Sequence, residues 1–249
     1  MLESLKAAPK LEALFKSAAG SGPHKINSSL PIKIEVVSKL YGIKYMLKLG
    51  NVETETKSLK DLQVGSNYWA VMKKSSTNSI ILSNLTPQPK ILEFARFFDM
   101  DFKDLHRIMS DSSGDIFKNL KNEIMNRLAG SNDRNEFWFW TNVLISMQQG
   151  VITLPFRYED KEFLMQLKKR YAKDVLDFYA TFPNLGEIEG VIKAFNKELF
   201  LELKVQFASV KALLLKESKE LSGVTLSKVV IDKVKPLYEF NNSLLDLKG

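Results

Sequence analysis

The sequence predicts an α+β protein in three structural parts: a small N-terminal antiparallel β barrel, a helical middle segment and a C-terminal mixed β domain with one main helix. Three observations predict this fold class. Short runs of alternating apolar and polar residues fill the first third, apolar residues at helical spacing fill the middle, and alternation returns after Gly150. The predicted parts are residues 1–30 (a helix-like segment and flexible linker), 31–86 (the barrel), 87–150 (the helical segment) and 151–249 (the C-terminal domain).

The first 30 residues combine a helical pattern with the composition of a linker. Residues 2–15 place four leucines and Phe15 roughly on one helical stripe, which Pro9 interrupts. Residues 17–30 are small, polar and rich in Gly and Ser, which is typical of a flexible linker.

The predicted barrel rests on five short alternating runs. Ile32, Ile34 and Val36 alternate with charged residues, and turn residues such as Gly50 and Gly65 separate the runs. The expected strands are residues 32–38, 42–49, 52–58, 68–73 and 79–83.

The middle segment has apolar residues at helical spacing. A first helix carries the apolar residues from Ile91 to Phe98, a second those from Phe102 to Met109, and two longer helices follow. The predicted N-caps are Asp99 or Asp101, then Asp115, then Asn132 or Asp133.

Four consecutive aromatic residues, 137–140, lie on the last of these helices. Four successive helical residues cannot share one face, so at least one should point away from the stripe that contains Leu144. The cluster either joins the helices to a β domain or exposes an aromatic side chain that binds a partner.

After Gly150 the sequence predicts a second set of strands with one helix between the last two. Gly223 ends the helix. The expected elements are strands at 151–158, 162–169, 175–181, 187–195 and 198–207, a helix at 209–222 and a final strand at 226–234.

Composition narrows the class of protein. The chain has no cysteine, which excludes disulfides, thiol catalysis and Cys-bound zinc and suits a cytoplasmic location. Its apolar runs are shorter than the roughly 18–20 residues that span a bilayer, so we expect no membrane insertion. The net charge of +7 is concentrated in residues 1–90, which hold 13 Lys, no Arg and 6 acidic residues. Lysine without arginine favours a solubilising or steering role over sequence readout.

The sequence predicts no catalytic residues, no metal site and no cofactor. His24 and His106 lack the spacing of a zinc motif, and Asp99, Asp101 and Asp104 lack the glycine and final glutamate of a calcium loop. No dinucleotide-binding glycine motif, P-loop or GxSxG elbow is present. These absences argue against a nucleotide enzyme or a serine hydrolase of common type. An enzyme with an unrecognised site stays open as an alternative, but we expect a protein that is not an enzyme.

An alternative function is single-stranded nucleic-acid binding by the Lys-rich barrel. Tyr45, Tyr68 and Trp69 could stack on bases beside lysines at positions 33, 44, 48, 73 and 74. Alternation places Tyr68 and Trp69 on opposite faces, so at most one of them joins a given stacking surface.

The last third contains a turn of Pro183, Asn184, Leu185 and Gly186 that opens an alternating strand. A second strand with residues 199–203, a helix from Ser209 to Leu221 and a strand around residues 228–231 follow. With this pattern, about residues 150–235 resemble the C-terminal domain of flagellar hook-length control proteins, and the chain would be a compact, divergent member of that family.

The resemblance implies a non-catalytic bacterial protein of the flagellar type III export system. The C-terminal domain would bind the cytoplasmic domain of the export-gate switch protein and change export from rod and hook subunits to filament-type subunits. By the same resemblance, the partner-binding residues would be Pro183, Leu185, Gly186 and Glu187. It implies a cytoplasmic protein and leaves open whether the chain is itself exported.

The chain departs from better-known members of that family in one respect. They carry a long polar segment, rich in Pro and Gln, that acts as a ruler, and here the predicted barrel and helices take its place. The flexible residues 17–30 span at most about 50 Å when fully extended. A role in partner binding is therefore expected, and whether any ruler function remains is left open.

Overall fold

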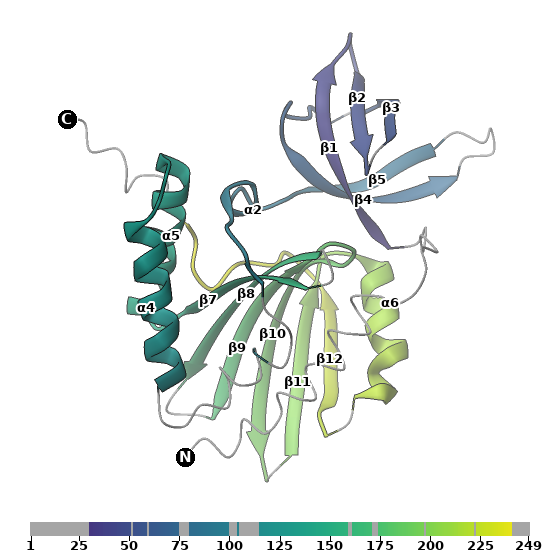
Figure 1. The fold of residues 1–249 in the computed structure, drawn as a ribbon. Coiled ribbons are helices and arrows are strands. Elements are labelled where there is room, and N and C mark those ends of the chain that lie inside the picture. Colours follow the sequence, from purple (N-terminus) through teal and green to yellow (C-terminus); the bar gives the residue numbers. More distant parts are fainter. Residues whose placement is uncertain are drawn as a thin grey trace.

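The chain has an α+β fold built on two β-sheets, one of five strands and one of seven (Figure 1). The computed structural model describes residues 30–50, 52–58, 60–74, 80–99, 104, 115–158, 161–170, 174–196, 198–221 and 223–240. The predicted α+β class is thereby confirmed. The helix-like segment at 2–15 and nearly all of the predicted linker lie outside the described residues.

The seven-stranded sheet contains all the strands that follow Gly150. Its order is β12-β11-β10-β9-β8-β7-β6, with antiparallel neighbours from β7 to β11 and parallel pairing of β6 and β12 at the two edges. The strands after Gly150 match the predicted ones apart from their ends. The bounds are β6 Phe98–Asp99, β7 Ile152–Tyr158, β8 Lys161–Arg170, β9 Val175–Phe182, β10 Gly186–Phe195, β11 Glu198–Val205 and β12 Thr225–Ile231.

Helix α6 (Ala208–Glu217) connects β11 to β12. The two strands are parallel, so the chain must cross over, and a helix is the usual crossover. Val210 and Leu214 of the helix are buried in the same core as Leu201 and Leu203 of β11. The helix ends earlier than predicted, and a 3-10 turn, η2 (Ser218–Glu220), follows it.

Helices α4 (Asp115–Ala129) and α5 (Arg134–Gln148) form a hairpin beside β7 (Figure 1). Asp133 is the N-cap of α5, because its Oδ1 accepts a hydrogen bond from the backbone N–H of Glu136 at 2.8 Å. The Glu136 carboxylate in turn accepts from the N–H of Asn132 at 3.1 Å. These reciprocal bonds satisfy backbone donors that a helix start leaves unpaired.

The aromatic residues 137–140 attach this hairpin to the sheet. Trp138, Phe139 and Trp140 are buried, whereas Phe137 is 45% exposed. The prediction that one of the four points away from the core is confirmed. Trp140 lies 5.4 Å from the Phe98 ring centroid, so the cluster joins α5 to β6.

The segment after β12, residues 232–240, crosses the sheet face that α5 also covers. The side-chain amide of Gln166 on β8 donates to the Tyr238 carbonyl at 3.0 Å and accepts from its N–H at 3.1 Å. The Tyr238 hydroxyl donates to Asn142 Oδ1 of α5 at 3.2 Å. The last described part of the chain therefore completes the main core.

The five-stranded sheet has the order β3-β2-β1-β4-β5, with every neighbouring pair antiparallel. Its five strands agree with the five that the sequence predicts. The bounds are β1 Pro31–Lys39, β2 Lys44–Leu49, β3 Val52–Lys57, β4 Asn67–Lys74 and β5 Ile80–Pro87.

The predicted closed barrel is not found, because the sheet is open among the described residues: β3 and β5 form its two edges. The sequence of β3, VETETK, offers no apolar face to fill a barrel interior. On β4, Trp69 and Val71 point toward the core of the larger sheet, whereas Ala70 joins a separate core with Ile34 and Leu47. Both faces of β4 are thus packed against a core, so burial of its apolar side chains does not require the sheet to close into a barrel.

The start of the middle segment is also less helical than predicted. Helix α2 contains only Ile91–Phe94, and Phe98 and Asp99 form β6 at the edge of the larger sheet. Asp99 is therefore a strand residue and not an N-cap. The predicted helix with Phe102 and Met109 lies outside the described residues. Within the described part, none of the helices is long and apolar enough to cross a membrane.

Candidate functional site

The turn predicted to bind a partner connects β9 to β10. Its residues 183–185 reverse the chain, and β9 and β10 then pair from Phe182 opposite Gly186 to Val175 opposite Lys193. Gly186 has φ +76°, a left-handed conformation that disfavours other residues. A Cβ at Gly186 would lie 2.7 Å from Phe207 Cε2, so the ring closes over the turn.

Most of the predicted binding residues are buried. Leu185 has no exposed surface and belongs to the main core, and Gly186 is buried beneath Phe207. Glu187 is only 7% exposed. Among the four, only Pro183 is partly exposed. The buried side of the turn is therefore formed by Leu185, Gly186 and Glu187. A partner could contact the turn at Pro183 and its neighbour Asn184.

Glu187 is held in a buried hydrogen-bonded group. The Tyr179 hydroxyl donates to its Oε1 at 2.7 Å, and Gln206 Nε2 donates to its Oε2 at 2.5 Å. Burial raises the pKa of the Glu187 carboxyl above its ordinary value, although both hydrogen bonds favour the ionised form. Gln206 Oε1 is buried with no hydrogen-bond partner among the described residues.

Replacing Glu187 by Gln should stabilise the protein at neutral and alkaline pH. A carboxyl whose folded-state pKa is raised favours folding while protonated, and this contribution is lost as pH rises from 4.5 through the folded pKa. Once the Gln206 amide turns over, its Oε1, which is unpartnered here, can accept from the amide of the new side chain. We expect the variant to have a higher free energy of unfolding than the unaltered protein at pH 8.

Urea denaturation of both proteins between pH 4.5 and pH 8 measures this difference. The difference should grow with pH and then level off. Glu198→Gln, which changes an exposed carboxyl on β11, is the matched control. A difference for Glu187→Gln that is the same at every pH would contradict the expectation.

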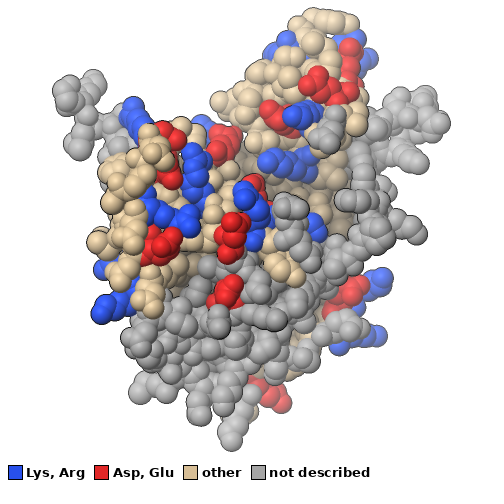
Figure 2. Space-filling view, in the orientation of Figure 1, with Lys and Arg blue, Asp and Glu red and all other residues tan. Residues whose placement is uncertain are grey.

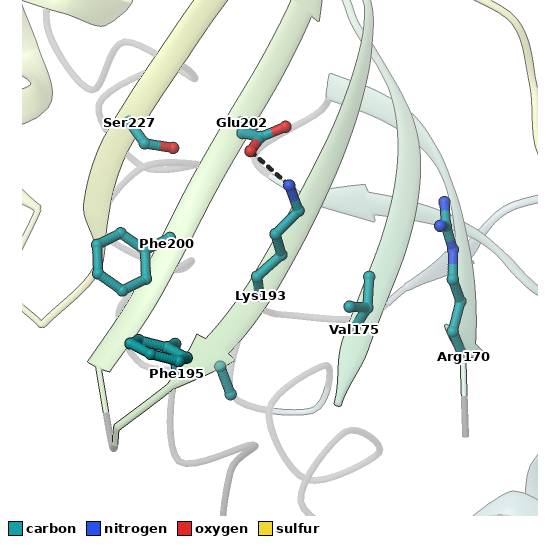
Figure 3. A pocket seen from close by; sticks show the side chains of 8 residues that line it. Arg170, Val175, Lys193, Phe195, Phe200, Glu202 and Ser227 are labelled. Carbon is teal, nitrogen blue, oxygen red and sulfur yellow. Dashed lines mark hydrogen bonds and ion pairs between the residues drawn. The ribbon is translucent and has the colours of Figure 1, made fainter. Parts of the chain in front are cut away.

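A second surface lies at the other end of β10 and was not predicted. Arg170, Val175, Lys193 and Phe200 are paired in turn across β8, β9, β10 and β11, and directly paired residues share one face of a sheet. They line an open groove of about 600 Å³ (Figure 3). We call it the sheet groove; its other lining residues are Ala194, Phe195, Glu202 and Ser227.

The sheet groove combines two aromatic rings with paired charges. Phe195 is 65% exposed, and Figure 3 shows it at the same end of the groove as Phe200. Lys193 Nζ contacts Glu202 Oε1 at 2.5 Å. Arg170 forms a two-bond ion pair with Asp177, at 2.6 and 2.7 Å. Aromatic rings beside neutralised charges are suited to contact with another protein surface.

Among the described residues that line it, the sheet groove has one hydroxyl group and no histidine. The hydroxyl, Ser227 Oγ, donates to the Leu201 carbonyl at 3.0 Å. No group of three or more metal-ligating side chains occurs anywhere in the described part of the chain. The described lining residues therefore offer no nucleophile with an adjacent histidine base.

One signal in the sequence could have found the sheet groove. On β10 and β11 the alternation places Ile192 and Leu201 on the buried face, which leaves Phe195 and Phe200 on the polar face. A large aromatic at a position that alternation assigns to solvent is the kind of exposed apolar surface that marks an interaction site.

The nucleic-acid alternative loses its stacking surfaces in this structure. Tyr45 and Trp69 are each 1% exposed, and the half-buried Tyr68 uses its hydroxyl to accept from the N–H of Gln63. Figure 2 shows basic and acidic side chains interspersed over the described residues on the side of the molecule that is drawn there. Tyr45, Tyr68 and Trp69 therefore do not supply the open stacking surface that single-stranded nucleic-acid binding by the predicted barrel requires.

Fold and groove together define an α+β protein with an open groove on its larger sheet. Comparison of the chain with protein-family models, with curated proteins and with solved structures finds no match.

Proposed function

We propose that this chain is a non-catalytic, protein-binding component of the flagellar type III export system, similar to hook-length control proteins. The observation that carries the proposal is the element order β9, turn, β10, β11, α6, β12 within one sheet. It is the order on which the resemblance rests, and the turn of Pro183 to Gly186 opens β10.

In this proposal the partner is the cytoplasmic domain of the export-gate switch protein, and the sheet groove is the main contact. The groove lies on the same β10 and β11 as the resemblance and exposes Phe195 beside Phe200. Aromatic anchors commonly carry most of the binding energy at protein interfaces. Because both rings project from paired strands, docking orders little flexible chain and costs little entropy.

The proposed outcome of binding is a change of export from rod and hook subunits to filament-type subunits. The groove and the exposed part of the turn, Pro183 and Asn184, lie at opposite ends of β10. Variants at each end therefore separate the two contact surfaces.

Binding of the full chain to the export-gate protein's cytoplasmic domain tests the proposal. We expect Phe195→Ser combined with Phe200→Ser to weaken the affinity at least about tenfold, since loss of two aromatic anchors costs more than about 1.4 kcal/mol. Calorimetric titration gives the dissociation constant. Phe137→Ser removes an exposed phenylalanine on α5, away from the groove, and should leave the affinity unchanged.

Two results would refute the proposal. The first is the absence of binding by the unaltered chain, together with normal hook length and motility in a strain that lacks the gene. The second is an equal loss of affinity in the groove variant and in Phe137→Ser, which would show that the two groove phenylalanines do not mark the contact.

A further inference from the structure

The hairpin that joins β1 to β2 exposes a cluster of apolar side chains at its tip. Val37, Leu40, Tyr41 and Ile43 are 37%, 40%, 67% and 47% exposed. Four large apolar residues are thus exposed within seven positions of one hairpin, whereas exposed apolar residues on protein surfaces commonly occur singly. We call these residues the hairpin tip.

Backbone hydrogen bonds hold the tip in one conformation. The N–H of Leu40 donates to the Lys44 carbonyl at 2.9 Å, and the N–H of Lys44 donates to the Tyr41 carbonyl at 3.0 Å. Gly42 supplies the left-handed residue of the turn, with φ +58°. The N–H of Ser58, just after β3, donates to the Ile43 carbonyl at 2.9 Å. The apolar side chains are thus displayed by a fixed scaffold.

Lysines surround the hairpin tip. Lys39 and Lys44 belong to the hairpin, Lys57 lies opposite Lys44 in the strand register, and Lys60 follows Ser58 closely. The nearby acidic residues are Asp61, which pairs with Lys39, and Glu55, which pairs with Lys44. Four lysines and two acids leave a positive balance at the tip. From residue 31 to residue 87 the chain carries eight Lys, no Arg and four acidic residues, a net charge of +4.

The tip lies at the end of the small sheet that is farthest from the larger sheet (Figure 1). It is formed by the turn between β1 and β2, with the end of β3 beside it (Figure 1). A protein interface usually buries about 800 Å² per partner, which the four partly exposed apolar side chains of the tip cannot supply alone. A fluid lipid surface, in contrast, adapts its shape to a projecting apolar loop.

We propose that the hairpin tip binds the surface of an anionic lipid membrane. Leu40 and Ile43 enter the boundary between headgroups and acyl chains, and the amphipathic ring of Tyr41 lies at the headgroup level. The excess of two lysines over acidic residues attracts the anionic headgroups, and each uncompensated lysine near such a surface strengthens binding about fivefold. This is surface attachment, so it needs no membrane-spanning segment.

Sedimentation of the full chain with lipid vesicles tests this binding surface. We expect binding to vesicles that contain phosphatidylglycerol to exceed binding to pure phosphatidylcholine vesicles at least about tenfold. Binding should also weaken as salt rises from about 50 to 200 mM, because salt screens the lysines. Equal binding to both vesicle types, or none to either, would overturn the proposal; in the second case a protein partner would be the better occupant.

A pair of variants locates the contact. Leu40→Ser combined with Ile43→Ser should lower vesicle binding at least about tenfold, because two exposed aliphatic side chains no longer leave water. Val52→Ser is the matched control, since Val52 is 66% exposed but lies at the opposite end of β2 and β3. Its binding should equal that of the unaltered chain. Equal losses in both variants would exclude the tip as the contact.

A fluorescent label gives a second readout that does not depend on loss of binding. The chain contains no cysteine, so Tyr41→Cys creates a single site for an environment-sensitive dye. Emission from this dye should rise and shift to shorter wavelength on addition of anionic vesicles, whereas a dye on Val52→Cys should not respond. An unchanged emission at position 41 in a sedimenting protein would overturn the proposal.

Discussion

Replacing Trp140 by Ala is expected to lower the free energy of unfolding by about 3–5 kcal/mol. Trp140 has no exposed surface. Its ring lies 4.9 Å from the Phe139 ring and 5.4 Å from the Phe98 ring, measured between centroids. The Arg127 guanidinium of α4 lies 5.4 Å from the same ring. Truncation would therefore leave a cavity where α4, α5 and β6 meet.

Phe137→Ala is the matched control for this change. It removes an aromatic ring from the same helix, but Phe137 is 45% exposed, so we expect a loss of less than about 1 kcal/mol. Urea denaturation followed by circular dichroism measures both values. Similar losses for the two variants would mean that the buried cluster is not what attaches α5 to the sheet.

The strands of both sheets were predictable because alternation is a local signal. On β10 and β11 each buried residue is followed by one that faces the other side, so Ile192 and Leu201 identify the strands without knowledge of their neighbours. The N-cap of α5 could also be predicted from the sequence, since Asp133 was one of the two candidate N-caps. These features depend on interactions between residues close in the sequence.

Closure of the small sheet and the shape of the middle segment were not predictable in this way. Whether β5 pairs with β3 depends on residues far apart in the chain, and Trp69 reaches the core of the larger sheet instead of a barrel interior. Phe98 fits a helical pattern with Ile91, yet its pairing with Phe156 places it in a strand. Tertiary packing overrides local pattern in both cases.

The candidate sites were likewise predictable only where they depend on residues close in the sequence. The sequence identifies the turn at Pro183 and Gly186, because the backbone there needs a special conformation. It does not reveal that Phe207 covers the turn and that Leu185 is buried. The sheet groove depends on the register that brings Arg170, Val175, Lys193 and Phe200 into one row, and four strands must be paired correctly before it can be recognised.

Replacing Gly190 by Ala is expected to lower the free energy of unfolding by about 1–3 kcal/mol through overpacking. Gly190 lies in the middle of β10, opposite Phe178 of β9 and Leu203 of β11. A Cβ there would lie 2.2 Å from Phe178 Cζ and 2.9 Å from Leu203 Cδ2. Both side chains are buried, so neither can move aside into solvent. Thermal and urea denaturation measure the loss.

Replacing Phe178, the residue opposite Gly190, by the smaller Leu should offset much of this loss of stability. In the double variant Gly190→Ala with Phe178→Leu, the new methyl group occupies part of the space that the ring leaves, so the two changes should be less costly together than their sum. Gly130→Ala is the control, because the nearest atom to its Cβ is Asn126 O at 3.4 Å, and it should change stability by less than about 0.5 kcal/mol. If the two changes at Gly190 and Phe178 are simply additive, the ring is not what excludes a side chain at position 190, and close contact between β9, β10 and β11 must have another cause.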